Sequence, residues 1–109
     1  MKWEKGRQNS GYFKLTLWSR WNFDIHILKF PIRSKVLMHT DTVDDKNHHR
    51  LNIILKHAEL GGHFSCPLAH INTSRIKYFR PDIQFHSVSK IIKGTRYVLS
   101  IGWVTRRHP

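Results

Sequence analysis

The sequence predicts an all-β domain with a double-sheet jelly-roll fold. Short segments alternate between apolar and polar residues, as strands with one buried face do. Glycine- and proline-containing turns separate roughly eight such segments, and no helix of useful length stands out. At 109 residues and 39% hydrophobic content, the chain suffices for one modest core. We expect a single domain over residues 1–109, in which strands of residues 1–30 support a core of residues 31–104.

Two alternating segments begin the chain. Residues 12–18 (Y-F-K-L-T-L-W) and residues 23–30 (F-D-I-H-I-L-K-F) each place apolar side chains on one face. Residues 19–22 between them suit a hairpin loop. Pro31 ends the second strand, because proline cannot donate to a strand ladder.

The rest of the chain continues in short elements. The middle is predicted as strand, polar loop, strand, turn and short strand, over residues 35–41, 43–49, 50–57, 61–62 and 63–66. After a loop or irregular edge, the last strands are predicted over residues 75–79, 83–88, 90–92 and 96–104. In the last of them Tyr97, Leu99, Ile101 and Trp103 share a face, and we expect that face to lie in the core.

The chain is strongly basic. It carries 19 Lys and Arg against 7 Asp and Glu, a formal net charge of +12. This exceeds the charge of about 2–8 that solubility requires, and it attracts polyanions, of which nucleic acid is the commonest. Trp18 and Trp21 flank the predicted hairpin loop and are candidates for base stacking. Arg20 and Arg50 are candidates for phosphate contacts.

The composition also restricts location and metal chemistry. A single cysteine, Cys66, excludes an internal disulfide and a cysteine-based zinc site, and fits a reducing cytosol. No apolar run approaches the ~20 residues of a membrane span. The N-terminus has no apolar stretch of signal-peptide type. We therefore expect a cytoplasmic protein without a membrane segment.

One set of residues carries recognisable chemistry. His39 and Asp41 are two residues apart, so in a strand they share a face, either as a polar pair or as two ligands of one metal ion. His86 follows on a later predicted strand, and Arg96 comes ten residues after it. Two imidazoles and a carboxylate form the 2-His-1-carboxylate set that leaves open positions on non-haem Fe(II). A guanidinium deeper in the pocket can hold a carboxylate with two hydrogen bonds.

The order of these motifs is that of a known enzyme family. From about residue 28 to residue 104, the chain resembles the double-stranded β-helix of the Fe(II)/2-oxoglutarate-dependent dioxygenases, nearest to the prolyl-4-hydroxylase-like branch. The matching segments are M-H-T-D, H-R-L-N-I-I-L, G-G-H-F, F-R-P-D-I-Q-F-H-S-V and G-T-R-Y-V-L-S-I-G-W.

The resemblance implies a role for each of these residues. His39, Asp41 and His86 would ligate Fe(II), and Arg96 would bind the C5 carboxylate of the co-substrate 2-oxoglutarate. Asn52 lies on a strand that often points polar side chains at the co-substrate in this family, although a solvent-exposed face explains it equally well. Family members often have Ser or Thr two residues after the arginine, where this chain has valine, and Ser100 is the next hydroxyl on that face.

The implied activity is O2-dependent oxidation of a C–H bond, by hydroxylation or demethylation. The basic charge favours nucleic acid, or a protein bound to it, as the substrate. Family members also carry N-terminal helices that support the sheet. We expect none in this sequence, so support would come from residues 1–30, from a partner subunit, or not at all.

Two other functions fit the same residues. A small basic module on the same scaffold could bind nucleic acid or protein without catalysis, and its affinity would fall steeply with salt. A cupin-like metalloprotein could keep the metal ligands and not use 2-oxoglutarate, and it would tolerate the loss of Arg96.

Overall fold

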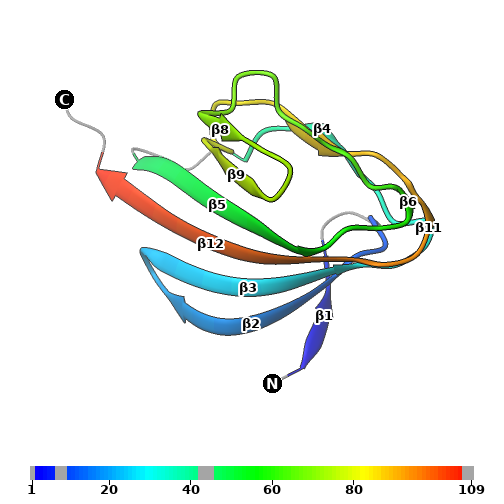
Figure 1. Cartoon of the computed structure of the whole chain (residues 1–109). Coiled ribbons are helices and arrows are strands. Elements are labelled where there is room, and N and C mark those ends of the chain that lie inside the picture. Colours follow the sequence, from blue (N-terminus) through cyan, green and yellow to red (C-terminus); the bar gives the residue numbers. More distant parts are fainter. Residues whose placement is uncertain (1, 7–9, 42–45, 107–109) are drawn as a thin grey trace.

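The computed structural model describes residues 2–6, 10–41 and 46–106, all of them in strands, turns or irregular segments (Figure 1). The predicted all-β jelly-roll fold is confirmed. No helix in these ranges is long and apolar enough to cross a membrane.

One large antiparallel sheet dominates the fold. Its strand order is β1-β2-β3-β12-β5-β9-β8. The bounds, in that order, are Trp3–Lys5, Phe13–Arg20, Phe23–Phe30, Arg96–Arg106, Lys46–Lys56, Ile76–Phe79 and Ile71–Asn72. The strands of the first 30 residues thus pair directly with β12, the last strand of the chain.

Two small antiparallel sheets lie on one side of the large sheet (Figure 1). The first has the order β4-β10-β7, with bounds Val36–His39, His86–Val88 and Phe64–Ser65. The second pairs β11 (Ile91–Lys93) with β6 (Leu60–Gly61) and marks the end where the chain folds over. We call the side of the large sheet that faces the small sheets its inner face, and the opposite side its outer face.

The main cluster of buried apolar side chains lies at this closed end, and Phe79, Cys66 and Val88 are buried elsewhere in the interior. Phe30, Ile54, Ile91 and Val98 are the buried members of this cluster, each no more than 3% exposed. Tyr12 packs against them, with its ring stacked on Phe30 at 4.9 Å between centroids. All four core residues are at or near the ends of their strands, so the rest of the interior is left for other side chains.

Some predictions of elements need correction. Residues 46–49 were expected in a polar loop, but they begin β5, because they pair with the end of β12 from Arg106↔Lys46 to Trp103↔His49. Residues 43–45 of that loop lie outside the described residues. The strand expected over residues 83–88 starts only at His86, because the amides of Ile83 and Gln84 both donate to the Arg80 carbonyl and form a turn. The first strand, β1, was not predicted at all.

The predicted core face of the last strand is wrong. Tyr97, Leu99, Ile101 and Trp103 are on the outer face of the sheet and only half-buried. The alternate residues of β12 are buried instead, and they are Arg96, Val98, Ser100 and Gly102. The reason is that the inner face carries polar side chains around a cavity, so hydrophobic alternation marks the outer face here.

Candidate metal centre and its cavity

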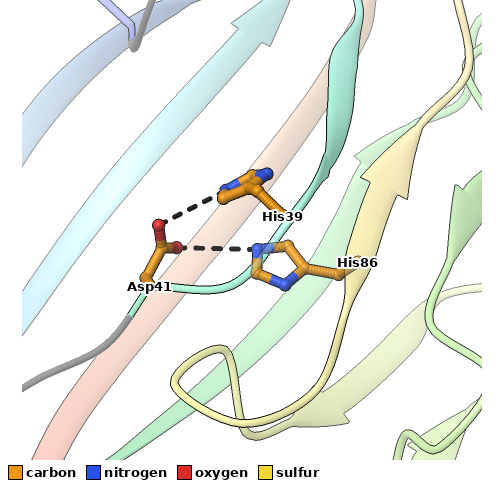
Figure 2. Close-up of side chains that lie close together, drawn as sticks. All are labelled: His39, Asp41 and His86. Atoms are coloured by element: carbon orange, nitrogen blue, oxygen red, sulfur yellow. Dashed lines mark ion pairs between the residues drawn. The ribbon is translucent and has the colours of Figure 1, made fainter.

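Two histidines and one aspartate lie close together where β4 ends and β10 begins in the first small sheet (Figure 2). His39 is the last residue of β4, and its direct pairing partner His86 is the first residue of β10. His39 Nε2 is 3.3 Å from Asp41 Oδ1, and His86 Nε2 is 3.6 Å from Asp41 Oδ2. One ligand atom from each residue lies within 4.8 Å of the other two.

A β-bulge directs His39 into the interior. Val36 pairs with Val88 and His39 with His86, so Leu37 and Met38 together oppose one residue of β10. The extra residue shifts the alternation, and Val36 and His39 therefore both line the interior although they are three residues apart. Leu37 and Met38 are exposed.

Asp41 is not placed by the strand pleat that the sequence suggested. β4 ends at His39, so Asp41 lies in the segment beyond the strand. Its amide donates to the carbonyl of Pro81, at 2.6 Å, in the turn that precedes β10. This backbone bond ties the two segments that carry the cluster.

Backbone carbonyls orient both imidazoles. His39 Nδ1 lies 2.6 Å from the Leu37 carbonyl oxygen, and His86 Nδ1 lies 3.0 Å from that of Gln84. A carbonyl only accepts, so Nδ1 carries the proton in each neutral ring and Nε2 is the lone-pair atom directed at Asp41. This arrangement is typical of metal-ligating histidines.

The three residues fit a divalent transition-metal ion. Bonds of about 2.0–2.2 Å to a metal place neighbouring ligand atoms roughly 3–3.5 Å apart. The two nitrogen–oxygen distances of 3.3 and 3.6 Å are close to that spacing. Two imidazoles and one carboxylate are the donor set of non-haem Fe(II) sites with open positions.

Arg96 lines the same cavity, which has a volume of about 380 Å³. Its side chain is buried, with 3% of the residue exposed, and burial lowers its pKa to about 10, so it remains charged at neutral pH. Its guanidinium carbon lies 4.9 Å from the centre of the Phe30 ring. Within the described residues no carboxylate forms an ion pair with it, and a buried charge without a counter-ion is costly.

A hydrogen-bonded chain covers the inner face beyond Arg96. The Ser100 hydroxyl donates to Asn52 Oδ1, at 2.6 Å, and accepts from Arg50 Nη1, at 2.8 Å. Arg50 Nη2 donates to both carboxylate oxygens of Asp24 on β3, at 3.0 and 3.2 Å. Gly102 makes room for this crossing, because a Cβ there would lie 2.2 Å from Arg50 Nη2. Arg50 is therefore an interior, ion-paired residue rather than an exposed cation.

Sequence reasoning missed several residues of the cavity wall. Asp24 and His26 line it from β3, and Lys14 and His48 line it from β2 and β5. Burial raises the pKa of Asp24, but the hydrogen bond with His26 and the charge of Arg50 outweigh it, and the net shift is downward. Burial and then the Arg50 charge lower the pKa of His48 to about 4. The available signal for Lys14, Asp24 and His26 was that they occupy the polar positions of alternating segments, whereas His48 lies in a segment predicted as a loop.

The predicted nucleic-acid residues of the hairpin lie outside the cavity. Trp18 and Trp21 are 49% and 82% exposed. Each has a cation over its ring: the guanidinium carbon of Arg20 is 4.9 Å from the Trp18 centroid, and Lys46 Nζ is 5.4 Å from that of Trp21.

Comparison with known proteins identifies the fold. No family model and no curated protein matches the sequence. The solved structures that resemble it include KdgF from Halomonas sp. (TM-score 0.66, 13% identity, covering 98% of this chain and 90% of that one). They also include the cupin domain of Schizosaccharomyces pombe Cnp3 (TM-score 0.62, 8% identity, covering 96% and 69%). A sugar phosphate isomerase of the cupin superfamily from Silicibacter pomeroyi is similar too (TM-score 0.50, 14% identity, covering 97% and 68%). The chain has a cupin-type jelly-roll fold with a cluster that fits a metal ion.

Proposed function

We propose that this chain is an Fe(II)-dependent dioxygenase that uses 2-oxoglutarate as its co-substrate. The observation that supports this most is the content of one cavity. The His39–Asp41–His86 cluster and the buried Arg96 cation line it together. A dicarboxylate with a 2-oxo group is complementary to both, because one end can reach a metal ion and the other can neutralise a guanidinium.

The residues present would divide the work as follows. His39, Asp41 and His86 would hold Fe(II), which supplies the activation of O2 and of the 2-oxo acid for oxidation of a C–H bond. The Leu37 and Gln84 carbonyls fix the two imidazole rings, and Arg96 binds and orients the distal carboxylate. The apolar core behind Arg96 excludes water from that end of the cavity.

Asn52 and Ser100 act on the co-substrate indirectly in this proposal. They are bonded to each other and, through Ser100, to Arg50, so they stiffen the wall beside Arg96. The valine that replaces the family's Ser or Thr is Val98, a core residue. The carboxylate is therefore held by Arg96 without a hydroxyl from that position.

Nucleic acid, or a protein bound to it, is the substrate class that we propose. The net charge of +12 supports it, as does Trp21 of the β2–β3 hairpin, which is 82% exposed and has Lys46 over its ring. Stacking on aromatic rings and contacts to phosphate are how proteins bind single strands without reading sequence. Binding that falls steeply with salt, and that weakens in Trp21→Ala, is the expected result.

A cupin metalloprotein that does not use 2-oxoglutarate is the second candidate. The structural similarity to cupin-fold proteins, one of them described as a sugar phosphate isomerase, supports this class. It would retain the metal cluster and would tolerate the loss of Arg96.

Anaerobic titration with Fe(II) and then 2-oxoglutarate tests both candidates. A weak visible charge-transfer band that is absent from His39→Ala and His86→Ala is expected for the dioxygenase. The control His63→Ala removes an exposed histidine outside the cavity and should keep the band. Arg96→Ala should raise the 2-oxoglutarate concentration required by more than about tenfold, and the exposed Lys90→Ala should not.

The other outcomes of this titration favour one of the two alternative functions. Fe(II) binding without any response to 2-oxoglutarate would favour the second candidate. Failure to bind either one would leave a basic binding module, for which salt-dependent nucleic-acid binding is the next measurement.

A further inference from the structure

The outer face of the large sheet carries two uninterrupted apolar rows across its strands. In each row neighbouring residues are direct pairing partners. The first row consists of Trp3, Leu15, Ile27, Leu99, Ile53 and Ile76. The second row consists of Trp18, Ile25, Ile101, Leu51, Tyr78 and Ile71. Neither row contains a charged residue.

No element packs on these rows within the described part of the chain. Both small sheets lie on the inner side (Figure 1), and the outer strands of the face stay exposed. Trp3 is 46% exposed, Trp18 49% and Ile71 44%. Contiguous apolar surfaces of this extent mark interaction sites on soluble proteins.

The face is large enough to support a specific dimer. Strands about 4.8 Å apart make the seven-stranded face roughly 34 Å wide. At about 3.3 Å per residue, the four central strands of 8 or 11 residues exceed 20 Å in length, whereas β1, β9 and β8 have only 3, 4 and 2 residues. Burying that face on two copies removes roughly 1,300 Å² from water, within the range of about 1,200–2,000 Å² of stable interfaces. A twisted sheet also packs closely on another sheet of the same twist.

The side chains at the two ends of the face favour one orientation of two copies. Beyond the first row, Lys29 and Lys56 both pair with Tyr97 and place two cations at one end. Beyond the second row, Trp103 and His49 are stacked at 5.5 Å between ring centroids. A two-fold axis perpendicular to the strands, between the rows, brings the cations of one copy onto the aromatic rings of the other. An axis parallel to the strands would oppose cation to cation.

We propose that the chain forms a two-fold symmetric homodimer through this outer face, with the strands of the two copies antiparallel. The first row of each copy packs on the second row of the other, and Lys29 and Lys56 lie over the partner copy's aromatic rings. The contact is isologous, so two copies complete it and no larger assembly follows.

Sedimentation equilibrium of the full chain tests this proposal. The expected mass is twice 13.0 kDa, and Ile101→Glu, at the centre of the face, should return it to 13.0 kDa with an unchanged far-ultraviolet circular dichroism spectrum. The control Leu37→Glu changes a 70% exposed leucine on the small sheet and should remain dimeric. If Ile101→Glu does not fold, the double variant Leu99→Thr and Ile101→Thr keeps strand-forming residues and should weaken association more than about tenfold.

Further measurements test how the two copies are oriented and whether a second copy, rather than another partner, covers the outer face. Lys29→Glu with Lys56→Glu should weaken the dimer, whereas the same change at Lys90 and Lys93 should not. A wild-type mass of 13.0 kDa at every accessible concentration overturns the proposal, as does a dimer that Ile101→Glu leaves intact. A monomer that sediments with anionic lipid vesicles would also overturn it and assign the face to a membrane surface.

Discussion

The two faces of the large sheet differ in a way that reverses the usual arrangement of a soluble β-sandwich. The inner face carries Asp24, His26, Arg50, Asn52 and Ser100, while the outer face carries the two apolar rows. Many buried side chains of the inner face form hydrogen bonds and ion pairs, and the main cluster of buried apolar residues lies at the closed end. In this sheet the polar positions of a strand therefore mark the face that lines a cavity, and the apolar positions do not mark the buried face.

The largest expected effect concerns the metal cluster of the inner face. Asp41→Ala removes the carboxylate that both imidazoles face, so affinity for Fe(II), or for Co(II) as a stable probe, should fall by more than about 100-fold. Its stability should change little, because the cluster lines a cavity rather than the core. Calorimetric metal titration and thermal melting measure the two quantities. A fold lost together with metal binding would make Asp41 a structural residue.

The core at the closed end should be the most sensitive apolar region. Ile91→Ala should lower the free energy of unfolding by about 2–5 kcal/mol, because Ile91 is 0% exposed. Ile92 is its neighbour in sequence and is 54% exposed, so Ile92→Ala is the matched control and should cost less than about 1 kcal/mol. Urea denaturation compares them. Equal losses would mean that the burial of Ile91 does not set its contribution to stability.

The hydrogen-bonded chain across the inner face requires a glycine at position 102, where a side chain would collide with Arg50. Gly102→Ala should displace Arg50 from Asp24 and cost about 1–3 kcal/mol of stability, because the new Cβ would lie 2.2 Å from Arg50 Nη2 and 3.0 Å from Asp24 Oδ1. In the Arg50→Ala background the same substitution should cost clearly less, since the obstacle is gone. Additive losses in this double-mutant cycle would show that Gly102 acts through the backbone instead.

The smallest expected effect is a pH dependence that separates the faces. The pKa of inner-face His48 is lowered from 6.5 to about 4, so the unfolded chain binds more protons between these values. Stability should therefore fall as the pH drops from 6.5 towards 4, by roughly 1–2 kcal/mol once partial exposure of His48 is allowed for. Urea denaturation across this pH range should show a flatter profile for His48→Asn.

Outer-face His49 is the matched comparison. Burial lowers its pKa too, in the same direction but without a large shift. His49→Asn should therefore flatten the profile less than His48→Asn does. The opposite ranking would contradict the assignment of His48 to the more strongly desolvated face.

Sequence determined much of this protein, because strand positions and side-chain chemistry are local properties. The alternation in residues 23–30 specifies β3, and the types and order of His39, Asp41, His86 and Arg96 single out one cavity. Alternation separates the two faces of a strand, but it does not say which face is inner. It therefore could not assign Trp103 to the outer face or Asp24 to the cavity.

Tertiary structure decided the rest through contacts between distant segments. Residues 46–49 have the sequence of a polar loop, but they form a strand because they pair with β12. His39 turns inward only because β10 opposes β4 with one residue fewer. Asp41 is held by a carbonyl 40 residues away in sequence, at Pro81. Each of these features depends on the register of a long-range pairing, which no short stretch of sequence encodes.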